Sequence, residues 1–187
     1  MKKIGILGGT FDPPHIGHLM VANEVKHTLQ LDEIWFMPTN KPPHKSEAIQ
    51  SNTHRLIMLE HAIKDTSYFK VNDIEMKRSG KSYTIETIQM LQEQYKDDKF
   101  YFIIGADMVE YLPKWYRIDE LIELVQFVGV KRQNYELKTD YPIIEVPVPT
   151  MEISSADIRS RIQKRKPFKY FLTTAVYHYI KEEKLYE

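Results

Sequence analysis

Two histidines, His15 and His18, stand three positions apart at the start of a segment with helical periodicity, residues 16–29. A loop rich in glycine and proline, residues 8–14, precedes them, and the apolar run before it, residues 4–7, favours a buried strand. A turn from a strand into a helix presents backbone N–H groups and the positive end of the helix dipole, and both bind phosphate. The two imidazoles can donate hydrogen bonds to phosphate oxygens as negative charge develops. The spacing therefore predicts a phosphate-handling active site.

The glycines and the backbone of this loop are further candidates for phosphate binding. Gly17 lacks a side chain, so a base or a phosphate could approach the helix backbone there. The other residues expected to bind the same nucleotide are Gly8, Gly9, Thr10 and Phe11. The alternatives for the histidines are an incidental pair or a zinc site. Zinc proteases place their histidines at i and i+4 with a glutamate between them, a spacing absent here, so we assign no metal ligand.

Two common nucleotide motifs do not account for this sequence. The dinucleotide fingerprint G-x-G-x-x-G is absent after the first strand, because the glycines there are adjacent. Residues 80–82 resemble the end of a P-loop, but the earlier glycine that a P-loop requires would fall at Glu75. The predicted phosphate site is therefore of another kind.

A second helix start, near residue 154, carries a similar combination of groups. Ser154 and Asp157 form the pattern S-x-x-D, which predicts a capping box. Ser155 and, one turn further on, Arg159 could clamp a triphosphate at the same place. The alternative is that the serine only caps the helix and that Arg159 and Arg161 are solvated. We favour the triphosphate clamp.

The segments that position these residues alternate between strands and helices. We predict strands over residues 4–7, 33–37, 69–74, 100–104, 126–130 and 143–146, and helices over residues 16–29, 53–64, 82–95, 107–112, 118–124, 154–162 and 170–183. This alternation predicts an α/β fold, a Rossmann-like doubly wound parallel sheet of about five strands with C-terminal helices. Asp107 follows Gly105 at the carboxyl edge of one strand, where open α/β sheets bind ligands. The alternative for Asp107 is a helix N-cap.

Length, charge and cysteine content exclude several classes of protein. The 187 residues fit a single domain, with a C-terminal helical part from about residue 154. Lys plus Arg and Asp plus Glu both total 26, so the net charge is zero, which argues against a dedicated nucleic-acid binder. The absence of cysteine excludes disulfides, thiolate zinc sites and a cysteine nucleophile. No apolar stretch is long enough to cross a bilayer or to serve as a signal peptide. We therefore expect a cytoplasmic protein with no membrane partner.

Two motifs resemble those of the nucleotidylyltransferase superfamily. They are Gly-Thr-Phe-Asp-Pro-Pro-His-Ile-Gly-His at residues 9–18 and Ile-Ser-Ser-Ala-Asp-Ile-Arg at residues 153–159. Between them, residues 38–45, residues 105–107 and residues 112–115 are similar to the bacterial nicotinate mononucleotide adenylyltransferases. The resemblance covers nearly the whole chain in order and spacing.

The resemblance implies adenylyl transfer from ATP to nicotinate mononucleotide, which gives deamido-NAD and pyrophosphate, with Mg²⁺ bridging phosphate oxygens. One alternative is another acceptor, such as nicotinamide mononucleotide or pantetheine phosphate. Another is a nucleotide-sensing module without turnover, although paired histidines and Arg159 would be superfluous there. No nucleic-acid partner is expected, and the sequence is compatible with a homo-oligomer.

The resemblance also implies roles for individual residues. It makes His15, His18 and Arg159 catalytic, with the histidines at the α- and β-phosphates and with Ser155 and Arg159 at the β- and γ-phosphates. Ala156 stands where the family usually has threonine, so that hydroxyl contact is not expected here. The remaining residues implied to bind ATP are Gly105, Asp107, Arg132 and Ser154.

On the acceptor side, the resemblance implies five substrate-binding residues: Lys41, His44, Thr84, Tyr111 and Trp115. Lys41 would lie over the mononucleotide phosphate, although a solvated charge cluster is the alternative. The face of Trp115 would attract the cationic pyridine ring, although an ordinary core aromatic is the alternative. Backbone N–H groups at Thr84 and Tyr111 would donate hydrogen bonds to a carboxylate. They would face the NH₂ donor of an amide, so the acid is favoured as substrate.

Overall fold

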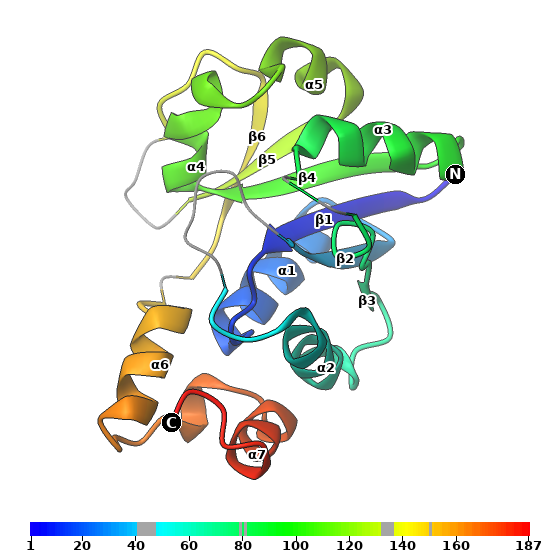
Figure 1. The fold of residues 1–187 in the computed structure, drawn as a ribbon. Helices are drawn as coiled ribbons and strands as arrows, with labels where there is room; N and C mark the ends of the chain where they lie inside the picture. The colour runs from blue at the N-terminus through cyan, green and yellow to red at the C-terminus, as the bar shows by residue number, and fades with distance from the viewer. Residues whose placement is uncertain (41–47, 79, 81, 132–136, 150) are drawn as a thin grey trace.

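One six-stranded sheet forms the centre of the computed structural model, which describes residues 1–40, 48–78, 80, 82–131, 137–149 and 151–187. The strands are β1 (Lys3–Gly9), β2 (Glu33–Pro38), β3 (Phe69–Val71), β4 (Lys99–Gly105), β5 (Gln126–Lys131) and β6 (Ile143–Pro147). All neighbouring pairs are parallel, in the order β3-β2-β1-β4-β5-β6 (Figure 1). This is the strand order of a Rossmann sheet, with the reversal between β1 and β4. The predicted doubly wound sheet is confirmed, with six described strands instead of about five.

The helices follow the prediction closely, with one break. They are α1 (Ile16–Thr28), α2 (Asn52–Ile63), α3 (Thr84–Gln94), α4 (Ala106–Tyr111), α5 (Ile118–Leu124), α6 (Ser155–Gln163) and α7 (Thr174–Glu182), with 3-10 turns η1 (Leu112–Lys114) and η2 (Lys169–Phe171). The single helix predicted over residues 170–183 is wrong, because Leu172 is extended. The Thr173 side chain then accepts a hydrogen bond from the backbone of Val176 and starts α7 as its N-cap.

Strand β3 is also shorter than predicted, because it ends at Val71 instead of residue 74. The Asn72 side chain accepts a hydrogen bond from the Ile74 backbone at 3.1 Å. The Asp73 carbonyl accepts from the backbone of Met76. These local hydrogen bonds replace the strand by a turn.

Helices lie on both faces of the sheet (Figure 1), and an apolar cluster fills each of the two interfaces. In β1, Ile4 and Ile6 are buried against a cluster with α3, α4 and α5, whereas Leu7 belongs to a cluster with α1 and α2. The alternation follows the two-residue period of a strand. Both faces are therefore covered, and the loop after β1 emerges from the middle of the sheet.

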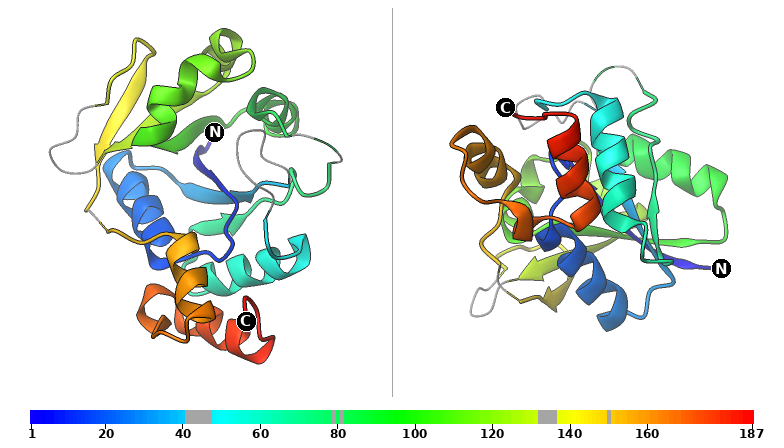
Figure 2. Two further views of the ribbon diagram at one scale, coloured as in Figure 1. Left: turned by 60° about the vertical axis from the view of Figure 1, so that its left-hand side comes forward. Right: turned by 90° about the horizontal axis from the view of Figure 1, so that it is seen from below.

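The C-terminal helices α6 and α7 add a further layer outside α2 (Figure 2). Their apolar cluster includes Met58 of α2, Ile158 of α6 and Val176 of α7, all fully buried. This packing brings the start of α6 to the loop after β1, where the Ser155 hydroxyl donates to the carbonyl of Pro13 at 2.8 Å. None of the helices in the described ranges has the length and apolarity needed to cross a membrane.

Candidate active site

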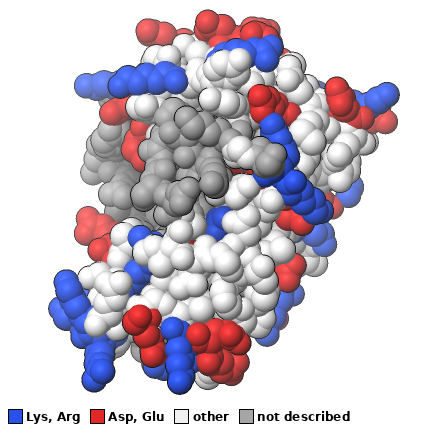
Figure 3. Space-filling model, in the orientation of Figure 1, with Lys and Arg blue, Asp and Glu red and all other residues white. Residues whose placement is uncertain are grey.

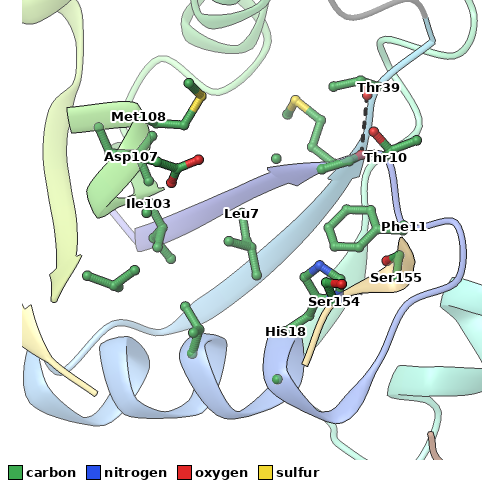
Figure 4. Close-up of a pocket in the computed structure, with 18 of the residues that line it drawn as sticks. Leu7, Thr10, Phe11, His18, Thr39, Ile103, Asp107, Met108, Ser154 and Ser155 are labelled. Carbon is green, nitrogen blue, oxygen red and sulfur yellow. Dashed lines mark hydrogen bonds between the residues drawn. The ribbon is translucent and has the colours of Figure 1, made fainter. Parts of the chain in front are cut away.

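An open cavity of about 1190 Å³ lies at the carboxyl ends of β1 and β4, where the strand order reverses. Open α/β sheets bind ligands at this point, and the volume exceeds the range of about 300–1,000 Å³ typical of a single small ligand. Most of the predicted site residues line it: Gly8, Gly9, Thr10, Phe11, His15, Gly17, His18, Thr84, Gly105, Asp107, Trp115, Ser154, Ser155 and Arg159. Figure 4 shows Asp107 on one side of this space and His18 with Ser154 and Ser155 on the other.

Of the other four predicted residues, the structure describes only Tyr111. Tyr111 ends α4 and does not line the cavity, and the Lys114 ammonium lies 5.0 Å from the centre of its ring. Lys41, His44 and Arg132 lie outside the described residues.

The two histidines form a stacked pair at the start of α1. Their ring centroids are 3.7 Å apart, with an interplanar angle of 28°. The backbone N–H of His15 donates to Nδ1 of His18 at 3.1 Å. Because Nδ1 accepts this bond, a neutral His18 ring carries its proton on Nε2. The ring of Phe11, 4.9 Å from that of His18, supports it edge-on, so the orientation of His18 is set by its neighbours.

His15 is almost fully enclosed, with 8 % of its surface exposed. This burial lowers its pKa from 6.5 to about 4, so the imidazole is neutral at pH 7. Its Nδ1 atom is buried and has no hydrogen-bond partner in the described part of the chain. A Cβ atom on Gly17 would lie 3.0 Å from this Nδ1. A larger residue at position 17 would therefore require the His15 ring to shift by a few tenths of an ångström, a constraint that the sequence did not reveal.

The burial of His15 predicts that acid weakens the fold. The unfolded chain takes up a proton near pH 6.5, whereas the folded chain takes it up only near pH 4. Between these values the unfolded state binds more protons, so the free energy of unfolding falls as the pH falls. Between pH 7 and pH 4, the free energy of unfolding should fall by about 3 kcal/mol more in the wild type than in His15→Gln. Urea unfolding of both proteins measures this difference, and parallel losses in the two would contradict it.

The loop after β1 has a strained but well-supported backbone. Phe11 adopts φ 49°, a left-handed conformation that is uncommon for a residue with a side chain. Its ring is 1 % exposed and covers Gly9, where a Cβ atom would approach it to 3.0 Å. The backbone N–H of Thr39, at the end of β2, donates to the carbonyl of Gly9 at 2.9 Å. A side chain at position 9 would therefore require the Phe11 ring to shift by a few tenths of an ångström.

The start of α6 contributes the second predicted motif. Ser154 is the N-cap of α6, and its hydroxyl accepts from the backbone N–H of Asp157 at 3.1 Å. The predicted capping box is only half present, because the Asp157 carboxylate accepts from the Ser154 hydroxyl, at 2.5 Å, instead of from the Ser154 backbone. Arg159 lines the cavity and donates from Nη1 to the carbonyl of Asp12 at 2.7 Å. Arg161 instead points its guanidinium at the carbonyl of Pro167. The two arginines of α6 thus have different surroundings.

The opposite side of the cavity is aromatic and apolar. Trp115 is half-buried, and its ring packs edge-on against Phe102 and Phe127 at centroid distances of 5.9 and 5.8 Å. It is therefore both a core aromatic and a lining residue. Gly105, and not Asp107, caps α4, so the N-cap alternative for Asp107 is wrong. The Asp107 carboxylate lies against Gly105, where a Cβ atom would approach it to 2.9 Å.

Sequence reasoning missed four buried polar residues near this cavity: Asp12, Arg55, Glu75 and Tyr186. Burial raises the pKa of Glu75, which lines the cavity and accepts from the Thr87 hydroxyl at 3.0 Å. Asp12 stands within the first motif, and Arg55 falls on the inner face of a predicted helix. A charged residue at either position indicates a buried partner, because charged side chains are almost never fully buried unless they are paired.

The cytidylyltransferase-like family model matches residues 6–161, a span that includes the histidine-bearing loop at the switch point of the Rossmann-like sheet. The chain belongs to that family and, within it, to the nicotinate-nucleotide adenylyltransferases. It is 52% identical over 188 residues to the nicotinate-nucleotide adenylyltransferase of Bacillus subtilis, covering 100% of both chains. It is 54% identical to the "Probable nicotinate-nucleotide adenylyltransferase" of Oceanobacillus iheyensis, covering 100% of this chain and 97% of that one.

The same fold occurs in a solved structure of low sequence identity. The nicotinic acid mononucleotide adenylyltransferase of Plasmodium falciparum, complexed with NaAD, superimposes with a TM-score of 0.80 at 21% identity. The match covers 100% of this chain and 98% of the other. This likeness supports the Rossmann-like architecture.

Proposed function

We propose that this chain transfers the adenylyl group of ATP to the phosphate of nicotinate mononucleotide, forming deamido-NAD and releasing pyrophosphate, in the synthesis of NAD. The observation that carries this proposal is that the histidine pair and Arg159, from two distant motifs, line one cavity at the switch point of the sheet. The cavity is large enough for two nucleotides side by side. Full-length relatives at 52% and 54% identity that carry this activity in their names support it.

The reaction is a displacement at the α-phosphorus of ATP. A phosphate oxygen of the mononucleotide forms the new P–O bond to the α-phosphorus. The bond from the α-phosphorus to the oxygen that joins it to the β-phosphorus breaks, and this oxygen leaves with pyrophosphate. The attacking phosphate is already ionised at pH 7, so no strong general base is required. The chain has to align the two nucleotides and neutralise the charge that develops on the leaving group. We assign this task to His15, His18 and Arg159, with Ser155 beside them.

Mg²⁺ is expected to enter with ATP. Within the described ranges, no three His, Asp or Glu side chains gather into a group that could hold a metal ion. Mg²⁺ retains several waters and is commonly held by substrate phosphates with one or two carboxylates. The site fits that mode, because the carboxylate of Asp107 lines the cavity and would be available to such an ion, which would supply positive charge to the substrate phosphates.

The acceptor is proposed to lie between Trp115 and the start of α3. The Trp115 face can attract the pyridinium ring, and Thr84 is the first residue of α3, where backbone N–H groups lack partners within the helix. Such donors favour a carboxylate over an amide. Four further contacts stay predictions: those of Lys41, His44 and Tyr111 with the acceptor and that of Arg132 with ATP.

Coarser proposals on domains, location and partners accompany the reaction. We expect residues 1–187 to act as a single domain, because the α6–α7 cluster includes Met58 of α2. A cytoplasmic location and the oligomeric state stay predictions. A nucleic-acid partner is not expected, since Lys plus Arg and Asp plus Glu both total 26, and side chains of both signs occur on the face shown in Figure 3.

Parallel assays of pyrophosphate release test the proposed function. With ATP, nicotinate mononucleotide should give the fastest release, ahead of nicotinamide mononucleotide and pantetheine phosphate. A faster reaction with another acceptor would correct the substrate. ATP binding without pyrophosphate release would favour a nucleotide-sensing module instead.

A further inference from the structure

A buried carboxylate lies beneath the loop after β1. Asp12 is 2 % exposed, although it stands in the middle of the phosphate-binding segment. Its Oδ2 accepts from the backbone N–H of Ile49 at 2.7 Å and of Gln50 at 3.4 Å. Its Oδ1 accepts from the hydroxyl of Tyr186 at 2.6 Å. One side chain thus joins the loop to two segments far from it in sequence.

Two arginines hold the same loop by its carbonyl groups. Arg55 of α2 is fully buried, and it donates from Nη1 to the carbonyl of Thr10 at 2.7 Å and from Nη2 to Asn52 at 2.6 Å. Arg159 donates to the carbonyl of Asp12. Burial lowers the pKa of Arg55, and the nearby Asp12 carboxylate opposes that shift. The charges of Asp12 and Arg55 therefore stabilise each other inside the fold.

Tyr186 reaches this network from the segment after α7. It is 6 % exposed and packs in the apolar cluster of α6 and α7, with its hydroxyl 3.9 Å from the sulfur of Met58. Its φ of 66° is disfavoured for a residue with a side chain and persists only where the surroundings hold it. Burial and the bond to Asp12 raise the pKa of Tyr186, so the hydroxyl remains a donor.

We propose that Asp12, Arg55 and Tyr186 form a clasp that positions the phosphate loop, and that Tyr186 is a positioning residue for adenylyl transfer. The inference rests on the proposed function. Asp12 stands three positions before His15, and the clasp holds both Asp12 and the carbonyl of Thr10. Displacing a reacting group by about 1 Å can cost about 10²-fold in rate. The clasp therefore acts on the loop that binds ATP, and the acceptor side is affected less.

Tyr186→Phe tests the clasp, with Tyr68→Phe as the matched control. Tyr68 donates its hydroxyl to Asn23 at 2.9 Å, and neither residue lines the cavity. Each variant loses one hydroxyl hydrogen bond and keeps its ring. We expect kcat/KM for ATP to fall about tenfold in Tyr186→Phe, with KM for the acceptor changed less than about twofold and the control close to wild type. Equal kcat/KM for ATP in both variants would overturn the proposal.

A double-variant cycle separates positioning from general stability. If Tyr186 acts through Asp12, then Asp12→Asn with Tyr186→Phe should be within about twofold of Asp12→Asn alone, whereas independent effects would multiply. Amide hydrogen exchange adds a readout that needs no activity: the backbone of Phe11 and His15 should exchange faster in Tyr186→Phe than in Tyr68→Phe. Unchanged exchange would contradict the clasp even if the wild type proved inactive toward nicotinate mononucleotide. Should Tyr186→Phe fail to fold, Asp12→Asn takes its place under the same criteria.

Discussion

His18→Ala is expected to lower kcat by about 10²–10³-fold, because one preorganised hydrogen-bond donor to a developing charge is lost. The stacking on His15 and the hydrogen bond that the His18 Nδ1 accepts orient this ring and leave its proton on Nε2. His18→Ala removes that donor. The fold should remain, because His18 belongs to none of the buried apolar clusters. Pyrophosphate release at saturating substrates gives kcat, and circular dichroism checks the folding.

His27→Ala provides the control for this prediction. His27 lies in the last turn of the same helix, α1, and is exposed, so its loss should leave kcat within about twofold. His18→Gln should recover part of the rate, because its amide can donate from a position similar to Nε2. Near-normal turnover of a folded His18→Ala protein would remove this residue from the mechanism.

Arg159→Ala is expected to lower kcat/KM for ATP by a similar factor, about 10²–10³-fold. The substitution removes a cation from the cavity wall and the hydrogen bond to the carbonyl of Asp12. The first loss acts on the bound phosphates through charge in the proposed mechanism, and the second acts on the position of the loop after β1. Arg159→Lys keeps the charge but not the planar fork of donors, so it should recover only part of the loss. Steady-state kinetics with varied ATP concentration measures kcat/KM for the wild type, Arg159→Ala and Arg159→Lys.

Arg161, two positions further along α6, offers the matched control. Its guanidinium donates to the carbonyl of Pro167 and lies 4.7 Å from the centre of the Phe171 ring. Arg161→Ala should therefore change kcat/KM for ATP by less than about twofold. Equal losses in Arg159→Ala and Arg161→Ala would indicate damage to α6 itself, and would contradict a phosphate role for Arg159.

Local pattern accounts for most of the fold and for the histidine pair of the site. Strand and helix periods predict the alternating elements, and the histidine spacing places two imidazoles at one helix start because these features depend on neighbours in sequence. The break before α7 was missed, since apolar residues at helical spacing continue across Leu172. The preference of threonine for the N-cap position sets the start of α7 at Thr173, but the apolar periodicity hid this local signal.

The buried polar residues could not be predicted for a different reason. Asp12 and Tyr186 are 174 positions apart, and only the packing of α6 and α7 on α2 brings them together. Glu75 likewise follows a strand and lines the cavity only because a turn replaces the predicted end of β3. Such contacts are set by tertiary packing, which no sequence period encodes.

A crystal structure of this chain with deamido-NAD bound tests the central claim most directly. We expect the dinucleotide in the cavity between β1 and β4, with its phosphates within hydrogen-bond distance of His15 or His18 and with the pyridine ring against Trp115. Clear density for the dinucleotide at another place, with the loop after β1 making no contact to phosphate, would contradict the account.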